Sequence, residues 1–321
     1  MGLYEPASAL RTHMRGGSVV DAEGKEIWRS EDRSFSGGRF DSGDIELFRD
    51  DLGRLLCDAS RDTAEYLWNE SIVGLEQSDA GLRVSFERER SRDFEVLVAA
   101  DGLHSNVRRL VFGEEGPFVQ SFGIGLAIFS TPNVLHLADW QVSYRDQTSG
   151  YLIYPNRDNS ELRVNLGFGL GSQEIWRLDI QEQKALAAER CKHLRWEIPR
   201  LIEAMWSAKD FYLGDMALVK MPGWSRGRTT LLGDAAYCPT PFSGQGTSLA
   251  LVGAYVLARE LYRTPAEPSR AFERYESRMR PYVELNQALA DPSREEPTPD
   301  EVMDKAKHGI VLDDLPERRT S

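Results

Sequence analysis

A strand-like run at 228–234 sets the strongest limit on how this chain can fold. Its residues, Arg-Thr-Thr-Leu-Leu-Gly-Asp, are typical of a strand buried in a parallel sheet, and an apolar helix is predicted at 247–262. A strand, a turn and a helix in this order are typical of open α/β sheets, which bind ligands beyond the carboxyl ends of their strands. The carboxylate of Asp234 would lie at that edge, where it can accept hydrogen bonds from a sugar or polyol hydroxyl.

Glycines in the connecting turn support a ligand site. Gly244 and Gly246 allow the backbone to approach a planar ligand closely. The following helix offers unpaired N–H groups and the positive end of its dipole, which would stabilise negative charge on the ligand. The structural alternative is that Asp234 only caps the turn. That alternative is preferred for Gly-Asp or GxG alone, whereas the whole segment from Gly233 to Gly246 favours ligand binding.

A second segment, at 99–109, also ends a strand in Asp-Gly, here Asp101-Gly102. The nearly continuous apolar stretch before it predicts a strand buried on both faces of a parallel sheet. Ser105 could cap a short helix that carries Arg108 and Arg109. The structural alternative is an ordinary turn with a helix cap and solvated arginines.

A third segment is a helix predicted at about 48–59, in which Arg49 precedes Leu52 and Leu56. Because these neighbours at i+3 and i+7 are apolar, Arg49 is expected to face inward. The pattern is weak by itself, since most such arginines lie along a surface.

The order of the predicted elements indicates an α/β fold in which a parallel sheet is interrupted by an antiparallel one. Short strands of alternating hydrophobicity suggest an antiparallel sheet with one covered face. They are predicted at 140–144, 151–154 and 163–170. We therefore predict a parallel-sheet domain formed by residues 1–116 and 223–321, interrupted by an antiparallel sheet at 117–222.

Apolar spacing and turn residues predict further elements. A helix at 179–197 is expected to stop at Pro199, and Pro281 is expected to kink or divide a charged helix at 269–290. Residues from Thr298 to Glu301 match a capping box before the last helix. Strand-like pieces lie at 18–21 and 26–29, and a hairpin is predicted from 71–76 and 82–88 around Asp79-Ala80-Gly81.

Composition excludes several classes of protein. The formal net charge of −12, from 39 Lys and Arg against 51 Asp and Glu, argues against a surface for nucleic acid or anionic membranes. No apolar run reaches membrane-spanning length, and the first residues lack the core of a signal peptide. Three scattered cysteines, Cys57, Cys191 and Cys238, favour a reduced cytoplasmic protein. The five histidines have no metal-ligand spacing, so no metal site is predicted.

Together the three segments resemble the family of FAD-dependent monooxygenases that includes para-hydroxybenzoate hydroxylase and the tetracycline-inactivating monooxygenases. The resemblance extends over the whole chain, with the segments in the family's order and spacing. The family pattern GDAAHxxxPxxGxG occurs as Gly233–Gly246, with Tyr237 in the histidine position. The resemblance implies that the domain predicted from 1–116 and 223–321 is a doubly wound, Rossmann-like FAD-binding domain. It also implies that the antiparallel sheet at 117–222 is the substrate domain.

The resemblance implies which residues bind FAD and the nicotinamide cofactor. It implies that Asp234 holds the FAD ribitol, that Asp101-Gly102 lies near the pyrophosphate and contacts NAD(P)H, and that Arg49 contacts FAD. The predicted cofactor-binding residues are Arg49, Asp101, Gly102, Gly233, Asp234, Pro241, Gly244, Gly246 and Thr247. No catalytic side chain is assigned, because the cofactor performs the chemistry.

The sequence departs from the family pattern at three positions. Tyr237 replaces a histidine, Thr247-Ser248 stands where an asparagine is common, and Gly253 replaces an acidic residue. These departures bear on how the flavin is positioned rather than on family membership.

The start of the chain is a larger departure. No GxGxxG fingerprint is found, and Met1-Gly2-Leu3 resembles the middle of an early helix of the family. A βαβ unit with its connection, roughly 50 residues, is therefore expected to be missing, which leaves the doubly wound domain incomplete. We expect a misassigned or cut chain start, and the alternative is a shortened protein that cannot hold FAD tightly.

The first functional hypothesis is monooxygenation of a small molecule. The resemblance implies that NAD(P)H supplies electrons, that O2 supplies oxygen, and that one oxygen atom enters an aromatic or polyketide-like substrate. A second hypothesis is a non-catalytic remnant of the same scaffold that acts by binding. A third is a relative of flavin reductases or halogenases. Neither the substrate's identity nor the oligomeric state follows from the sequence.

Overall fold

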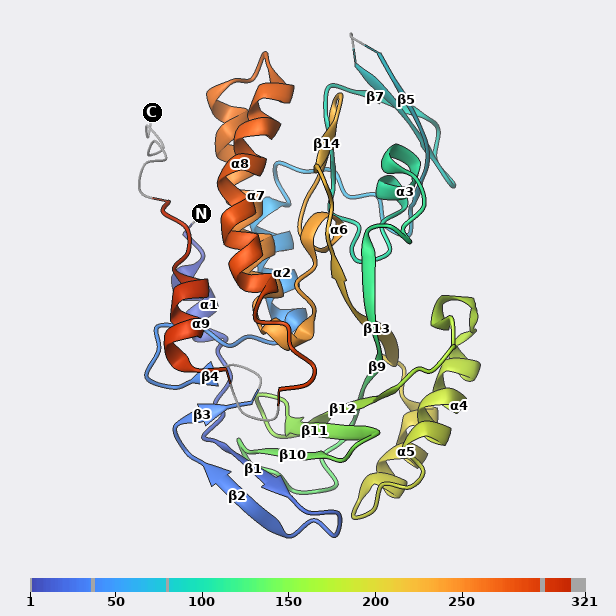
Figure 1. Ribbon diagram of the computed structural model, residues 1–321, viewed down its shortest axis with the longest axis vertical. Coiled ribbons are helices and arrows are strands. Elements are labelled where there is room, and N and C mark those ends of the chain that lie inside the picture. Colours follow the sequence, from blue (N-terminus) through green and yellow to red (C-terminus); the bar gives the residue numbers. More distant parts are fainter. Residues whose placement is uncertain (1, 36–37, 79–80, 295–297, 313–321) are drawn as a thin grey trace. The chain divides into compact units, whose positions relative to one another are not determined.

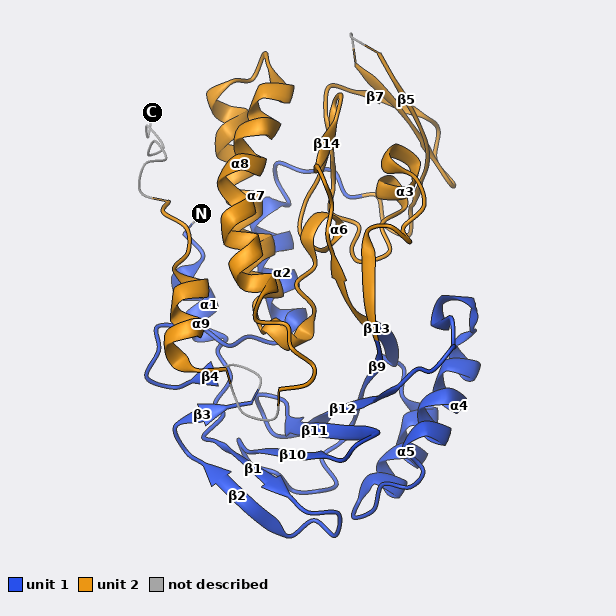
Figure 2. Cartoon of the chain, viewed as in Figure 1, with its two compact units in different colours: residues 1–66, 123–215 blue, residues 67–122, 216–321 orange. Residues whose placement is uncertain are grey.

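The computed structural model describes residues 2–35, 38–78, 81–294 and 298–312 (Figure 1). The chain forms two compact units, which Figure 2 distinguishes by colour. Unit 1 consists of residues 1–66 and 123–215, and unit 2 of residues 67–122 and 216–321. The chain passes from one unit to the other within two strands, β9 (Val119–Pro132) and β13 (Tyr212–Val219).

Residues 1–66 group with the antiparallel sheet rather than with the motif-bearing segments of unit 2. One reason is a strand pairing, since β1 (Gly17–Val20) pairs in parallel with β10 (Gln141–Arg145). The units therefore have different boundaries from the predicted domains, which were 1–116 with 223–321 and 117–222. The assignment of one part to FAD and the other to the substrate stays a prediction.

Unit 1 is built on a seven-stranded sheet with the order β13-β9-β12-β11-β10-β1-β2. The run β9-β12-β11-β10 is antiparallel throughout, which confirms the predicted antiparallel sheet. Its other strands are β2 (Glu26–Ser30), β11 (Ser149–Pro155) and β12 (Glu161–Gly169). The remaining elements are α1 (Tyr4–Ala9), β3 (Arg33–Ser34), β4 (Gly38–Arg39), α2 (Arg49–Ser60), η1 (Ile175–Arg177), α4 (Ile180–Cys191) and α5 (Ile198–Ser207).

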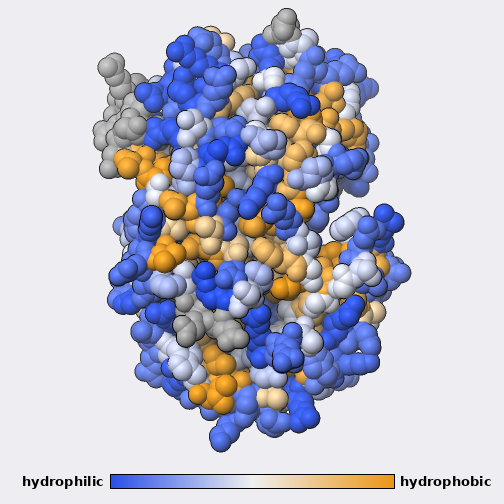
Figure 3. Space-filling view, viewed as in Figure 1, coloured by the Kyte–Doolittle hydropathy of each residue, from blue (hydrophilic) through white to orange (hydrophobic). Residues whose placement is uncertain are grey.

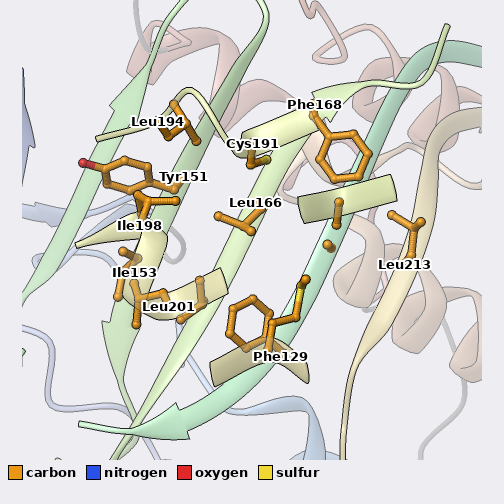
Figure 4. Close-up of a cluster of buried hydrophobic side chains, with 14 of the residues drawn as sticks. Phe129, Tyr151, Ile153, Leu166, Phe168, Cys191, Leu194, Ile198, Leu201 and Leu213 are labelled. Atoms are coloured by element: carbon orange, nitrogen blue, oxygen red, sulfur yellow. The ribbon is translucent and has the colours of Figure 1, made fainter. Parts of the chain in front are cut away.

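One face of this sheet packs against α4 and α5 and forms the core of unit 1 (Figure 4). Alternation along β12 buries Val164, Leu166 and Phe168 on that face, as predicted. Helix α5 contributes Ile198 and Leu201, both fully buried. Burying each such side chain stabilises the fold by about 1.5–3 kcal/mol relative to leaving it in water. The sheet and the two helices therefore hold each other in place.

The predicted single helix at 179–197 is wrong, because this segment contains the whole of one helix and the loop before the next. Helix α4 ends before Trp196, whose φ of +54° is left-handed and incompatible with a continuing helix. Pro199 lies in the first turn of α5 instead of stopping a helix, a position where its missing N–H costs nothing. A capping box that was not predicted, formed by Asp179 and Glu182, starts α4.

Unit 2 combines a short parallel strand pair with two long helices. β15 (Thr229–Leu231) pairs in parallel with β8 (Leu97–Ala99) and antiparallel with β14 (Ser225–Arg226). Helices α7 (Gly246–Arg263) and α8 (Pro268–Gln287) lie side by side (Figure 1). The other elements are β5 (Ile72–Gln77), β6 (Leu82–Phe86), β7 (Arg92–Phe94), α3 (Asn106–Phe112), α6 (Asp234–Tyr237), η2 (Pro241–Ser243) and α9 (Asp300–Lys307). These elements confirm the predicted α/β class.

Strand β8 is not buried on both faces, contrary to the prediction. In the part of the chain that the structure describes, β8 is the edge strand of the sheet β14-β15-β8, and Val98 keeps 36% of its surface exposed. The prediction relied on an apolar run, whereas full burial also requires covering elements around the strand.

Of the two predictions near the C-terminus, the capping box is wrong. Helix α8 is continuous through Pro281, so the proline does not divide it, and a kink at Pro281 stays a prediction. Thr298 does not begin a capping box, since Pro299 is the N-cap of α9 without a side-chain hydrogen bond. The Thr298 hydroxyl instead accepts a hydrogen bond from Arg294.

Both predicted sets of short strands are confirmed. β1 and β2 pair antiparallel, and so do β5 and β6. The Ser78 N–H donates to the Gly81 carbonyl at 2.9 Å and closes the second hairpin. Asp79 and Ala80, which the prediction placed in its turn, lie outside the described residues.

Hydrophilic side chains predominate on the face drawn in Figure 3. This agrees with a chain of which 28% is charged. Among the described residues, no helix combines the length and apolar character that crossing a membrane would require.

One carboxylate holds the turn between β10 and β11. Asp146 Oδ1 accepts hydrogen bonds from the backbone N–H groups of Thr148 (2.7 Å) and Ser149 (2.9 Å). Its Oδ2 lies 3.0 Å from Nε2 of His193, which follows α4. Burial raises the pKa of Asp146, but the hydrogen bonds outweigh burial and hold the pKa below its usual value of 3.8. The ionised carboxylate therefore stabilises the fold.

Replacing Asp146 by asparagine should lower the free energy of unfolding by about 1–2 kcal/mol near neutral pH, because charge-assisted hydrogen bonds are weakened. Since the folded pKa is depressed, this stabilisation is present above the unfolded pKa and is lost as the pH falls through the folded pKa. Urea unfolding of both proteins at about pH 7 and about pH 2 checks this. The difference should vanish at the lower pH, and the exposed control Asp62→Asn should show little difference at either pH. An equal loss at both pH values would contradict the assignment.

Candidate functional site

Two of the predicted motifs meet at one edge of the small sheet in unit 2. Strands β8 and β15 are parallel neighbours, with Ala99 opposite Leu231. The Leu232 N–H continues the pairing by donating to the Ala99 carbonyl at 2.8 Å. Because both strands end at the same edge, the Asp101-Gly102 and Gly233-Asp234 turns follow side by side.

The Gly233-Asp234 turn has a backbone that only glycine adopts readily. Gly233 has φ +62° and ψ −138°, and its carbonyl accepts the N–H groups of Ala236 (3.0 Å) and Tyr237 (2.9 Å). A Cβ at this position would lie 3.4 Å from Cβ of Ala250 on α7. Asp234 is the first residue of α6 and is exposed. The turn therefore presents a carboxylate at the sheet edge, as the sequence predicts.

The carboxylate of Asp101 caps helix α3. It accepts hydrogen bonds from the Ser105 hydroxyl and from the Val107 N–H, the latter at 3.0 Å. Ser105 is the N-cap, and its Oγ accepts the Arg108 N–H at 2.9 Å, which confirms the predicted cap. Asp101 thus has a structural role in the turn, Gly102 follows it with φ +84°, and their contact with a cofactor stays a prediction.

Arg108 joins the two motifs. Its guanidinium is fully buried and donates to the carbonyl oxygens of Ala235 (3.0 Å) and Leu103 (2.6 Å). It also lies 3.3 Å from Glu115, which balances its charge. Burial lowers the pKa of Arg108 and Glu115 opposes that shift, but an arginine stays protonated at any ordinary pH. One cation therefore holds the turn after β8 against the first turn of α6.

The structural alternative of two solvated arginines is wrong for Arg108, although Arg109 is exposed. The sequence contained a signal that was not used: Val107, Arg108 and Val111 share one face of α3, and all three are buried. An arginine between two apolar positions of a helix needs internal partners, here carbonyl oxygens at the ends of both strands.

The turn between α6 and α7 contains backbone strain. Thr240 has φ +60° and ψ +156°, a conformation rare for a β-branched residue, and Pro241 follows it. The Thr240 hydroxyl oxygen is buried without a hydrogen-bond partner among the described residues. Pro241 starts the short helix η2, which ends at Gly244 with φ +65°. Strained residues and unpaired buried polar atoms concentrate at ligand sites.

The N-terminus of α7 lacks a side-chain cap, and the binding of a ligand there stays a prediction. Gly246 is its first residue, Thr247 is exposed, and its N-cap, Gln245, makes no side-chain hydrogen bond to the helix. The first N–H groups of a helix have no partner within it and attract negative charge.

These observations fit an FAD molecule. The exposed Asp234 carboxylate suits a polyol, and the uncapped start of α7 suits negative charge on a flavin ring. The buried Thr240 hydroxyl still lacks a partner. No group of three or more His, Cys, Asp or Glu side chains within the described residues could hold a metal ion.

Arg49 belongs to unit 1, whereas the other eight predicted residues belong to unit 2. It is the first residue of α2 and is exposed, so the expectation that it faces inward is wrong. The prediction relied on apolar spacing alone, but no residue of α2 is fully buried. The next residue, Asp50, pairs with Arg163 of β12 at 3.1 Å and ties the start of the helix to the sheet. A contact of Arg49 with FAD stays a prediction.

The cysteine beside the motif is not a nucleophile. Burial raises the pKa of the Cys238 thiol to about 12, and the neighbouring Asp234 carboxylate adds to the rise. The thiol therefore stays protonated at physiological pH, and a protonated thiol is unreactive.

Several aromatic residues of the antiparallel sheet take structural positions. Tyr151 is buried and stacks between Tyr144 and Trp196, with ring centroids 5.5 and 6.0 Å apart. Trp140 donates from its indole N–H to the Ser18 hydroxyl at 2.9 Å. Tyr154 points to the opposite face of β11.

Comparisons with known proteins agree with this geometry. Residues 48–289 match the family described as FAD binding domain. A flavin-dependent monooxygenase of Legionella longbeachae is 35% identical over 289 residues, which cover 89% of this chain and 73% of that protein. The crystal structure of the tetracycline destructase Tet(55) has a TM-score of 0.82 and 32% identity, covering 98% of this chain and 84% of that one.

This chain belongs to the FAD-dependent monooxygenase family. It is therefore a flavoprotein oxidoreductase, and its cofactor is FAD. A Klebsiella pneumoniae protein crystallised with FAD and uric acid, HpxO, shares the fold of this monooxygenase with a TM-score of 0.67 at 19% identity.

Replacing Arg108 of the monooxygenase by methionine should lower the free energy of unfolding by about 3 kcal/mol or more, because buried carbonyls and Glu115 lose their partner. The matched control is Arg109→Met on the same helix, which should change stability by less than about 0.5 kcal/mol. Urea unfolding followed by circular dichroism measures both. Similar effects of the two substitutions would contradict the bridging role of Arg108.

Proposed function

We propose that this flavoprotein monooxygenase uses NAD(P)H and O2 to insert one oxygen atom into an aromatic or polyketide-like small molecule. The observation that carries the proposal is the shared sheet edge where the Asp101-Gly102 and Gly233-Asp234 turns follow neighbouring strands, with α7 approaching Gly233 at Ala250. Three free thiols support a cytoplasmic location.

Each proposed cofactor contact follows from the chemistry of one group. FAD, when bound, supplies the redox chemistry, while the protein binds, orients and excludes water. Asp234 would accept hydrogen bonds from ribityl hydroxyls. The N–H groups of Gly246 and Thr247 would stabilise negative charge on the flavin ring. Gly244 and Pro241 would shape the turn around it.

The remaining predicted residues would act at the other parts of the cofactors. Asp101-Gly102, which ends the neighbouring strand, would lie near the pyrophosphate and NAD(P)H, with Asp101 fixing the turn through its cap of α3. The family resemblance supports a contact between Arg49 and FAD.

The substrate is proposed to contact the face of the unit 1 sheet opposite α4 and α5. Leu152, Tyr154 and Asn165 are directed to that face by the alternation of β11 and β12, and all three are half-buried. Tyr154 stacks with Phe48 at a centroid distance of 6.3 Å. Aromatic rings beside an amide suit an aromatic substrate with polar substituents. The similarity to tetracycline destructases, at 30–32% identity, supports a polyketide-like compound.

The proposal predicts that the purified protein, supplied with FAD, oxidises NADH or NADPH faster when a suitable aromatic or polyketide-like compound is added. With isotopically labelled O2, mass spectrometry should find one labelled oxygen atom in the product. A protein that binds FAD but shows no stimulation across a broad panel of such compounds would favour the binding-protein alternative. A protein that takes up no FAD would refute the proposal.

Asp234→Ala should raise the dissociation constant for FAD by about tenfold or more, because a charge-assisted hydrogen bond contributes about 1.5–3 kcal/mol. Quenching of FAD fluorescence during titration measures the constant. Asp304→Ala, an exposed aspartate on α9, is the control and should leave it unchanged. Equal FAD affinity of the Asp234 variant and the wild type would remove the proposed role of this carboxylate.

A further inference from the structure

Two departures from the family pattern, Tyr237 for histidine and Gly253 for an acidic residue, lie in direct contact. A Cβ built on Gly253 of α7 would clash with the hydroxyl oxygen of Tyr237 and would lie 3.3 Å from its Cζ. The phenol of Tyr237 therefore fills the space that a side chain at 253 would need. The two departures are one structural change, because either larger residue excludes the other.

The Tyr237 ring cannot move aside to make room. Its side chain is 1% exposed, and its ring packs against Trp224 with centroids 4.6 Å apart. Its hydroxyl accepts a hydrogen bond from the Tyr275 hydroxyl of α8 at 2.9 Å. In a close-packed interior, displacing a ring held on several sides requires its neighbours to shift as well.

The two tyrosines connect both ends of the turn that carries Asp234. Tyr275 also lies 3.2 Å from the carbonyl oxygen of Leu231, the last residue of β15. Tyr237 is the last residue of α6, so the hydroxyl pair spans the segment from the strand end to the helix end. This segment contains Gly233 and Asp234, and the pair anchors it to α8.

We propose that Tyr237 and Tyr275 are positioning residues that fix the Gly233-Asp234 turn for FAD, and that Gly253 is glycine because the Tyr237 hydroxyl occupies its side-chain space. This inference rests on the proposed role of Asp234 in binding FAD.

The surroundings of the two hydroxyls keep both tyrosines neutral. Burial raises the pKa of Tyr237 to about 12 and that of Tyr275 well above 10. The hydroxyl pair therefore stays neutral at physiological pH and acts through geometry alone.

The contact between Tyr237 and Gly253 is tested by a double-mutant cycle. Gly253→Ala should raise the dissociation constant for FAD at least tenfold in the wild-type background and less than threefold in the Tyr237→Phe background, where the hydroxyl is gone. Thermal unfolding of the FAD-free proteins should show the same rescue. Gly53→Ala on α2, where an added Cβ would meet nothing within 4 Å, is the matched helical control and should show no such coupling. Equal effects of Gly253→Ala in both backgrounds would overturn the steric part of the proposal.

The positioning role is tested with Tyr275→Phe, which removes only the hydroxyl. With the variant shown to be folded, its FAD dissociation constant should rise about threefold to tenfold, and the visible absorption bands and midpoint potential of the bound flavin should shift. A purely structural role would lower the unfolding temperature and leave these three properties of the bound flavin unchanged, and that result would overturn the proposal.

Failure of this inference can be distinguished from failure of the proposed function. If the wild-type protein binds FAD normally and the tyrosine variants bind it equally well, only the positioning role is refuted. If the wild type binds no FAD, the proposed function and the positioning role both fail, while the unfolding cycle on the FAD-free protein still decides the steric contact between Tyr237 and Gly253.

Discussion

The arrangement of the candidate site depends on the parallel pairing of β8 and β15. Two strands that are more than a hundred residues apart in sequence end at the same edge, and their terminal turns carry the two aspartates of the site. A pair of three-residue strands provides few hydrogen bonds, so the register needs further support. Arg108 supplies it, because its buried guanidinium binds carbonyl oxygens that follow both strands. A buried cation satisfied mainly by carbonyls allows little freedom of position, since any displacement leaves polar groups unpaired.

A second layer of support comes from the helices behind the turn. Tyr275 of α8 reaches the end of β15 and the hydroxyl of Tyr237, while α7 approaches the turn closely at glycine positions. The Gly233-Asp234 turn is thereby held on both sides. Arg108 of α3 contacts the carbonyl oxygen of Ala235 after the turn, and Tyr275 of α8 contacts that of Leu231 before it. Asp234 itself remains exposed. An exposed functional group on a firmly held backbone favours binding, because the protein loses little conformational entropy when the ligand binds.

The parts of the fold that the sequence predicted are those governed by local pattern. The strand at 228–234 and the helix after it followed from an apolar run bounded by glycines, and the alternation of Val164, Leu166 and Phe168 identified the covered face of the sheet. Features that depend on distant partners were missed. The burial of Arg108 requires a carbonyl at residue 235, and the exposure of Arg49 depends on what covers α2. Trp196 and Pro199 illustrate the same limit of prediction from sequence. The apolar spacing of a helix continues through this segment, although the left-handed backbone at Trp196 ends one helix and Pro199 begins the next.

The two aspartates are not equivalent, although each lies at the end of a strand beside a glycine. Both carboxylate oxygens of Asp101 accept hydrogen bonds from the start of α3, so this side chain is committed to shaping the turn. The Asp234 side chain is exposed at the start of α6 and has the buried, protonated Cys238 thiol beside it. Substituting Asp101 would therefore disturb the position of Arg108 and, through it, the backbone at residue 235. If an Asp101 variant lost cofactor binding, the cause would be a disturbed edge of the sheet. If an Asp234 variant lost it, the cause would be the loss of a direct contact with the cofactor.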